Sequence, residues 1–274
     1  MIGIFDSGIG GLSVLKEVRK ALPGADLVYY ADNANCPYGP KSREFVQARA
    51  EAITETLVGE YGADIIVIAC NTATAASIAY LRKKYSEPSE EGRRHILELT
   101  KGRHDHLMFI GMEPAVKPAS RQTRSGVIGV LATAGTLRGQ KYADIREQYA
   151  QNVRIMEHIG ENFVEMVESG KTEGPEAEAV VARSLQPMLD AGADTIVLGC
   201  THYPFLEKTI RKVAQDQGHP ITVINPAPAV TRHLAYVMAA EGISTKDRAN
   251  ATGQTILLSS GDDTELKRAF AKLL

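Results

Sequence analysis

GADTIVLGC, residues 192–200, is the stretch that decides the fold, because the chain uses the same pattern twice. GADIIVIAC occupies residues 62–70, and the two copies agree in register at Gly, Ala, Asp, Ile, Val and Cys. In each copy, a glycine suited to ending a helix leads into a continuous apolar run, which is typical of a central parallel strand. Ligands of open α/β sheets lie beyond the carboxyl ends of such strands. The repeat therefore places Cys70 and Cys200 where chemistry is expected, one in each half of the chain.

The composition is that of an ordinary globular protein. The 274 residues are 44% hydrophobic and 23% charged, with a formal net charge of -2. This balance favours neither nucleic acid nor a membrane surface as a partner. No apolar run approaches the length of a membrane span, and residues 1–6 lack the features of an export signal. Because an odd number of cysteines argues against a disulfide framework, we expect a cytoplasmic protein.

Strand and helix patterns alternate along the chain, which predicts an α/β fold with parallel sheets and right-handed crossovers. Because the cysteine stretch recurs, we expect two pseudo-symmetric, doubly wound parallel-sheet domains with the active site in the cleft between them. The first domain would comprise residues 1–112 and 206–274, and the second residues 113–205. Besides the two repeats, the expected strands are residues 2–5, 25–31, 107–111, 126–131, 153–157, 221–224 and 255–258.

Helical patterns connect these strands. Ser42 is suited to capping a helix that runs to about Tyr61. Its inward face would be formed by Phe45, Ala48, Ala52 and Ile53. Residues 86–106 are polar, mixed in charge and rich in histidine. This segment is interpreted as a solvated surface insertion with one short helix, in preference to a metal site.

The first strand ends in the glycine-rich turn DSGIGG, residues 6–11. Such a turn followed by a helix can bind an anion through backbone N–H groups. It does not match the dinucleotide fingerprint, because Ser13 occupies the third glycine position. A carboxylate-binding turn is favoured, although a plain strand-to-helix turn fits this stretch about as well.

Three chemistries are open for the paired cysteines. A redox pair is disfavoured because no C-x-x-C motif is present, and a zinc site with His202 lacks the usual close-spaced ligand pair. In the third, one thiolate removes a proton from a carbon centre while the other thiol protonates its opposite side. That scheme needs two groups related by near symmetry, which the repeat supplies. Asp6 and His202 could tune or share the protons. We expect neither a cofactor nor a metal ion.

An ordered set of motifs runs through most of the chain. They are FDSGIGGLSV at 5–14, PYG at 37–39, CNTA at 70–73, LAT at 131–133 followed by Thr136, and GCTHYP at 199–204. With these motifs the chain resembles the glutamate racemases, cofactor-independent enzymes of the aspartate/glutamate racemase superfamily. The resemblance implies two α/β domains, a homodimer, and interconversion of L- and D-glutamate, the latter a precursor of peptidoglycan.

Carried over residue by residue, the resemblance makes Cys70 and Cys200 the catalytic acid/bases, assisted by Asp6 and His202. Cys70 would deprotonate D-glutamate, and Cys200 would deprotonate L-glutamate. The substrate-binding residues implied in the same way are Asp6, Ser7, Tyr38, Gly39, Asn71, Thr72, Thr133, Thr136, Thr201 and His202. Glu168 is a candidate for an acidic residue near the second cysteine, but its divergent flanks do not assign it a role. Two alternatives stay open: a racemase of aspartate or a related acid, and a non-catalytic binding or regulatory protein on this scaffold.

Overall fold

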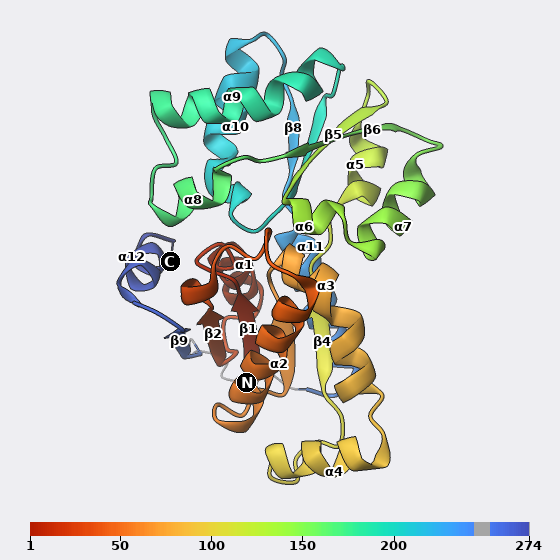
Figure 1. Cartoon of the computed structure of the whole chain (residues 1–274), viewed down its shortest axis with the longest axis vertical. Coiled ribbons are helices and arrows are strands. Elements are labelled where there is room, and N and C mark those ends of the chain that lie inside the picture. The colour runs from red at the N-terminus through yellow and green to blue at the C-terminus, as the bar shows by residue number, and fades with distance from the viewer. Residues whose placement is uncertain (244–252, 274) are drawn as a thin grey trace. The chain divides into compact units, whose positions relative to one another are not determined.

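Two parallel sheets, one in each of two units, organise the chain (Figure 1). The computed structural model describes residues 1–243 and 253–273. The first unit comprises residues 1–112 and 227–274, and the second comprises residues 113–226. The predicted α/β class with two parallel sheets is confirmed.

The boundary between the units lies later than the expected one at residue 206. Strand β8 (Thr222–Ile224) pairs in parallel with β7 (Thr195–Gly199), so it belongs to the second sheet. The preceding helix α10 (Glu207–Asp216) packs on α9 (Pro175–Asp190) of the same unit. Helix and strand therefore stay with the second unit, and the chain joins the first unit again at residue 227.

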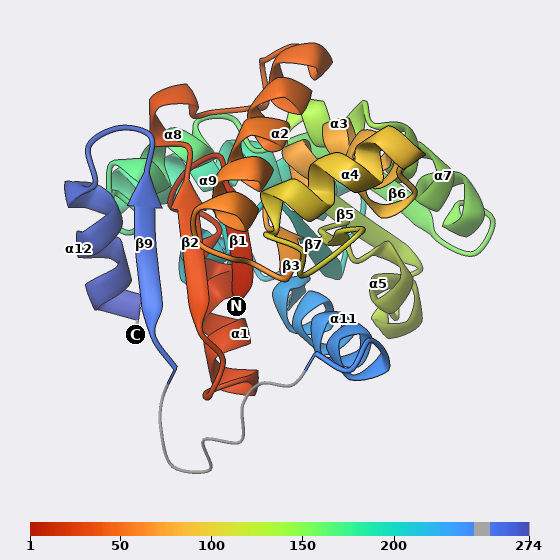
Figure 2. The same ribbon diagram turned by 90° about the horizontal axis from the view of Figure 1, so that it is seen from below.

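The first sheet has the strand order β4-β3-β1-β2-β9, with every pair parallel. Figure 2 shows β9, β2, β1 and β3 side by side, with helices on both faces. Helices α1 and α11 pack together on one face, and α2, α3 and α4 lie on the other. The strands are β1 (Ile2–Asp6), β2 (Leu27–Ala31), β3 (Ile65–Ile68), β4 (Met108–Gly111) and β9 (Thr255–Ser259). The helices are α1 (Leu12–Ala21), α2 (Arg43–Gly59), α3 (Asn71–Leu81), α4 (Glu90–Leu99), α11 (Ala227–Ala240) and α12 (Thr264–Leu273), with short helical turns η1 (Asn33–Asn35) and η2 (Arg82–Ser86).

The second sheet has the order β6-β5-β7-β8 and is also parallel throughout. Helices α5 and α7 pack together, as do α9 and α10. The strands not yet given are β5 (Val127–Ala132) and β6 (Arg154–Ile159). The remaining helices are α5 (Val116–Gln122), α6 (Ala134–Leu137), α7 (Gln140–Tyr149), α8 (Phe163–Glu168) and the 3₁₀ turn η3 (Tyr203–Leu206).

Apart from β9, the strands of the two sheets share one topology, and the repeated octet leads into and forms the equivalent strands β3 and β7. In chain order within each unit, the first strand lies between the second and the third, and the fourth lies beyond the third. The registers agree as well: Ile2 pairs with Ile65, and Ile128 pairs with Thr195, the repeat equivalent of Ile65. Following these registers makes Asp6 the counterpart of Ala132. Cys70 and Cys200 therefore follow equivalent strands, but the carboxylate of Asp6 has no counterpart in the second unit.

Glycine opens both repeats for a conformational reason. Gly62 and Gly192 have φ values of 70° and 84°, a region that L side chains rarely adopt. Each follows a long helix, α2 or α9, and turns the chain back toward the sheet. A side chain at either position would strain the turn that starts the cysteine-bearing strand.

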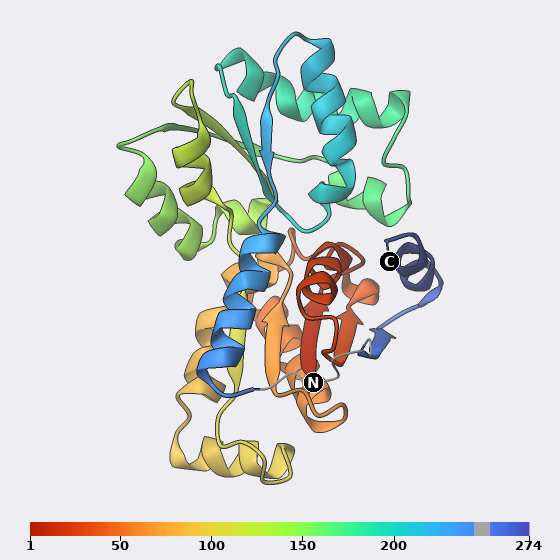
Figure 3. The same ribbon diagram turned by 180° about the vertical axis from the view of Figure 1, so that it is seen from behind.

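Two helix predictions need correction. Helix α2 begins after Ser42, whose hydroxyl accepts a hydrogen bond from Phe45 N as expected, but Ala48 and Ala52 of the predicted inward face are exposed. The residues of α2 that are buried are Val46, Ala50, Ile53, Thr54, Leu57 and Val58. Helix α11 was not predicted; Pro228 lies in its first turn, where proline is compatible with a helix. Figure 3 shows this helix, in blue, from behind.

Residues 86–106 form the predicted insertion with one short helix, α4, capped by Ser89. Its three histidines each contact a carboxylate rather than one another. His95 contacts Glu55, His104 contacts Asp64 and His106 contacts Asp105. Among residues 1–243 and 253–273, no helix combines the length and the apolar character that a membrane crossing requires.

Candidate active site

Cys70 lies at the carboxyl end of β3 and is the N-cap of α3. Its Sγ accepts a hydrogen bond from Ala73 N at 3.4 Å and donates to the hydroxyl of Ser7 at 3.7 Å. The cysteine is 5% exposed. Because the N-terminus of a helix carries a partial positive charge, this position favours the thiolate.

The turn after β1 is held rigidly beside Cys70. The Asp6 carboxylate, fully buried, accepts a hydrogen bond from Gly11 N, and the Tyr29 hydroxyl donates to Gly8 O at 2.6 Å. A Cβ on Gly11 would lie 2.7 Å from both Asp6 Cβ and the Tyr29 oxygen, so only glycine fits there. The predicted turn at residues 6–11 thus holds Ser7 at the carboxyl end of the sheet, next to the thiol.

Asn71 is a buried side chain that still has hydrogen-bonding capacity. It is 3% exposed, and neither its amide nitrogen nor its amide oxygen has a partner among the described residues. Buried polar groups are nearly always hydrogen-bonded. The amide at the start of α3 is therefore suited to binding a polar ligand, together with the neighbouring Thr72, which is 6% exposed.

Tyr38 lies in the loop between β2 and α2 and is fully buried. Its hydroxyl donates to the Asp32 carboxylate. Burial raises the pKa of Tyr38, and the hydrogen bond to Asp32 raises it further, so the phenol stays protonated. This leaves Tyr38 as a fixed, neutral group next to Gly39.

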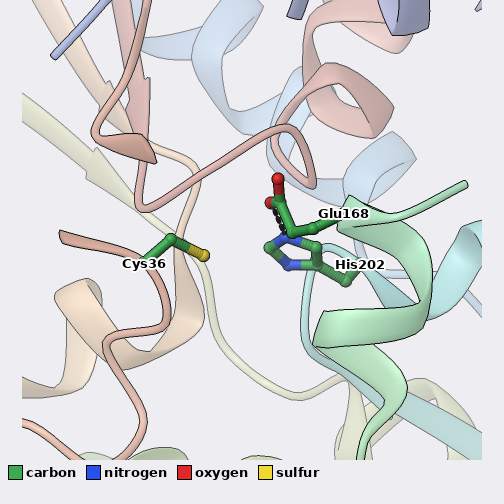
Figure 4. A group of neighbouring side chains, drawn as sticks. All are labelled: Cys36, Glu168 and His202. Atoms are coloured by element: carbon green, nitrogen blue, oxygen red, sulfur yellow. Dashed lines mark hydrogen bonds and ion pairs between the residues drawn. The ribbon is translucent and has the colours of Figure 1, made fainter. Parts of the chain in front are cut away.

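Cys200 differs from Cys70 in what surrounds it. It is followed by a turn and the 3₁₀ helix η3, whereas Cys70 is followed directly by the α-helix α3. Its Sγ lies 3.8 Å from His202 Nδ1, and His202 Nε2 lies 2.6 Å from Glu168 Oε1 (Figure 4). The carboxylate of Glu168 thus orients the imidazole beside the Cys200 sulfur.

The Cys200 turn packs against α8. The rings of Tyr203 and Phe163 make an edge-to-face contact with centroids 5.0 Å apart, and the Tyr203 hydroxyl donates to Gly160 O at 3.3 Å. A Cβ on Gly160 would lie 2.6 Å from the Tyr203 ring. Burial raises the pKa of Tyr203 well above its ordinary value, with a further contribution from Cys200. The packing fixes the relative position of α8, which carries Glu168, and the turn that carries His202.

Thr133 and Thr136 follow β5, the counterpart of β1. Thr133 caps α6 by accepting a hydrogen bond from Thr136 N at 3.3 Å, and the two hydroxyls lie 3.0 Å apart. Two hydroxyls and a helix start at the carboxyl end of a strand are suited to binding a carboxylate. By the register of the two sheets, Thr133 is the counterpart of Ser7.

Each unit thus gathers its own share of the predicted site at the carboxyl ends of its strands. The first unit carries Asp6, Ser7, Tyr38, Gly39, Cys70, Asn71 and Thr72, and the second carries Thr133, Thr136, Cys200, Thr201 and His202. Sequence reasoning did not assign Glu168. It lies 34 residues before His202 in the chain, and neither motif nor periodicity joins the two. The family resemblance marked Glu168 as a candidate for an acidic residue near the second cysteine, but its divergent flanks left its role open.

Comparison with known proteins decides the family. Residues 108–234 match the family model described as Asp/Glu/Hydantoin racemase. The glutamate racemase of Ectopseudomonas mendocina is 39% identical over 273 residues, which cover 100% of this chain and 94% of the relative. That of a Roseiflexus species is 43% identical over 242 residues, covering 88% of this chain and 80% of the relative. This chain belongs to the glutamate racemase family.

Solved structures of glutamate racemases share the fold over nearly the whole chain. The crystal structure of glutamate racemase from Francisella tularensis in complex with D-glutamate matches with a TM-score of 0.76 and 25% sequence identity. The match covers 100% of this chain and 92% of that one. The resemblance found in the motifs is therefore confirmed for sequence and fold together.

Proposed function

We propose that this protein is a cofactor-independent glutamate racemase that interconverts L- and D-glutamate and supplies D-glutamate for peptidoglycan synthesis. Family membership supports the activity, and one observation supports the mechanism. Cys70 and Cys200 follow equivalent strands of two sheets with the same topology, and each sulfur lies beside a polar side chain. Inversion of a carbon centre requires two acid/base groups, and the duplicated topology supplies a matched pair.

In this mechanism one thiolate removes the α-proton and the other thiol donates a proton to the opposite face. Cys70 acts on D-glutamate, and Cys200 acts on L-glutamate. The helix N-terminus favours the thiolate of Cys70, whose thiol form donates a hydrogen bond to Ser7. His202 Nδ1 lies 3.8 Å from the sulfur of Cys200, where it can exchange a proton with that thiol. Asp6 assists the first thiol as His202 assists the second.

The substrate carboxylates bind to hydroxyl, amide and backbone N–H groups in this proposal. The unpaired amide of Asn71 is the strongest support, because a buried amide needs a partner. The other binding residues proposed are Asp6, Ser7, Tyr38, Gly39, Thr72, Thr133, Thr136, Thr201 and His202. Fixed donors of this kind also stabilise the negative charge that develops when the α-proton leaves.

The test measures exchange of the α-hydrogen in D₂O, starting from each enantiomer, in the variants Cys70→Ser and Cys200→Ser. Each is expected to lower racemisation by about 1000-fold or more, since serine is a far weaker acid than cysteine and is a poor base at neutral pH. Cys36→Ser, which removes the third thiol, is the matched control and is expected to keep exchange from both enantiomers. Parental rates in both Cys70→Ser and Cys200→Ser would refute the two-thiol mechanism.

The nearest alternative is a racemase of aspartate or a related acid from the same superfamily. Glutamate and aspartate differ by one methylene, so the two are separated by comparing kcat/KM for both acids. A non-catalytic regulatory role is the other alternative, and absence of turnover with every acidic amino acid would favour it.

Location and assembly are part of the same proposal. We place the protein in the cytoplasm, because all three cysteines are free thiols. The family resemblance implies a homodimer, and light scattering at several protein concentrations tests that assembly directly.

A further inference from the structure

Asp32 is a buried carboxylate at the carboxyl end of the first sheet that the proposed reaction does not use. Its side chain is fully buried just beyond β2, the strand next to β1. Arg49 of α2 contacts both of its oxygens, with Nε 2.9 Å from Oδ2 and Nη2 2.8 Å from Oδ1. Burial alone would raise the pKa of Asp32, but the hydrogen bonds from Arg49 and Tyr38 outweigh it and lower the pKa below its ordinary value.

The same carboxylate organises the loop that carries Tyr38 and Gly39. Oδ2 also accepts the Tyr38 hydroxyl, and Oδ1 accepts Asn35 Nδ2 at 3.0 Å. One carboxylate thus joins helix α2 to two residues of the loop, Asn35 and Tyr38. We call Asp32, Arg49, Tyr38 and Asn35 the Asp32 network.

Arg49 is the component of this network that comes from a regular element. It is partly exposed and lies in the second turn of α2, whose buried apolar residues pack into the core of the first unit. Its guanidinium contacts the carboxylate through two nitrogens, which fixes the direction as well as the position of the contact. The hydrogen bond to Asp32 raises the pKa of Arg49, so the pair is charged throughout the physiological range.

We propose that Arg49 is a positioning residue for the reaction: by contacting both oxygens of Asp32, it holds the Tyr38–Gly39 turn in the conformation that binds substrate. This inference rests on the proposed function, in which Tyr38 and Gly39 contact glutamate. Arg49 acts through Asp32 and Tyr38. Loss of the contact therefore weakens binding of substrate and transition state alike, which raises KM more than it lowers kcat.

The experiment compares four variants with the parent enzyme. Arg49→Met keeps an unbranched apolar stem and removes all five donors, whereas Arg49→Lys keeps the charge but loses the two-nitrogen contact. The double substitution Asp32→Asn with Arg49→Met removes both charges together. Arg43→Met removes an exposed arginine from the first turn of the same helix and is the matched control.

Arg49→Met is expected to raise KM for glutamate by about tenfold with a change in kcat below about threefold, since loss of one well-placed contact to a charged group is of this size. Arg49→Lys is expected to fall between the parent and Arg49→Met. Arg49→Met also leaves the buried Asp32 carboxylate without its cation, so its melting temperature falls. In the double variant the melting temperature rises again, because no unpaired buried carboxylate remains. KM stays high, because the loop has still lost its contact with α2.

Each contrary result has a distinct meaning. If the parent enzyme does not racemise glutamate, the proposed function fails and the inference fails with it. If the parent is active but Arg49→Met leaves KM unchanged, the positioning role is refuted while the proposed function stands. If KM in the double variant recovers along with the melting temperature, Arg49 acts only through stability, and the inference is overturned. An equal rise in KM in Arg43→Met would assign the effect to lost helix charge and would also overturn it.

Discussion

Glu168→Gln is the substitution that isolates the second thiol. Glutamine keeps the shape of glutamate and can still accept the hydrogen bond from His202 Nε2, so only the negative charge is lost. Two unit charges about 4 Å apart interact by about 4 kcal/mol at an effective dielectric constant of 20. The Glu168 side chain is 24% exposed and that of His202 is 2% exposed, so solvent screens part of this interaction. We therefore expect the protonated His202 side chain to lose about 2 kcal/mol of stabilisation in Glu168→Gln. If the same energy is lost from the transition state, the rate falls by about 30-fold.

The loss must appear equally in kcat/KM for both directions, because two enantiomers have an equilibrium constant of one. The direction-specific signature is instead the isotope effect of substrate deuterated at Cα. When the step at Cys200 becomes rate-limiting, the isotope effect rises with deuterated L-glutamate, from which Cys200 removes the deuteron. With deuterated D-glutamate it shrinks toward one, because removal by Cys70 is no longer limiting.

The assay is circular dichroism of racemisation with protiated and deuterated substrates. Glu165→Gln, an exposed residue of the same helix α8, is the matched control and is expected to keep the parental rates and isotope effects. Isotope effects that rise equally for both enantiomers in Glu168→Gln would refute the assignment of Glu168 and His202 to Cys200. An unchanged rate would refute any role for the carboxylate.

Two further predictions concern the second unit. Gly199→Ala would bring a Cβ to 2.7 Å from Ala132 Cβ and 3.0 Å from Leu131 O, neither of which can move freely, so the free energy of unfolding should fall by about 1–3 kcal/mol in urea denaturation. Hydrogen bonds from the loop at residues 123–125 outweigh the effect of burial and lower the pKa of Asp194 to about 2, below the value of about 4 expected when unfolded. The ionised Asp194 side chain therefore stabilises the folded state fully above about pH 4, and this stabilisation is lost as the pH falls toward 2. Asp194→Asn, which removes it, should cost about 1 kcal/mol at pH 7. A cost that stays constant down to pH 2 would contradict the ionic origin.

The sequence by itself determined the two cysteine-bearing strands and the class of fold. A continuous apolar run between a helix-ending glycine and polar residues is a local signal, and its repetition indicated two similar sheets. The cap at Ser42 and the turn at residues 6–11 were equally local, because a side chain or a missing Cβ acts on backbone only a few residues away.

The tertiary structure alone decided which side chains contact His202 and Asp32, and where the second unit ends. His202 meets Glu168 and Arg49 meets Asp32 across 34 and 17 residues of chain, because folding brings different elements to the carboxyl ends of the strands. The boundary at residue 226 follows from the pairing of β8 with β7, a contact between strands that no local pattern encodes. Propensity and periodicity act along the chain, whereas pairing and packing depend on the surfaces that neighbouring elements present.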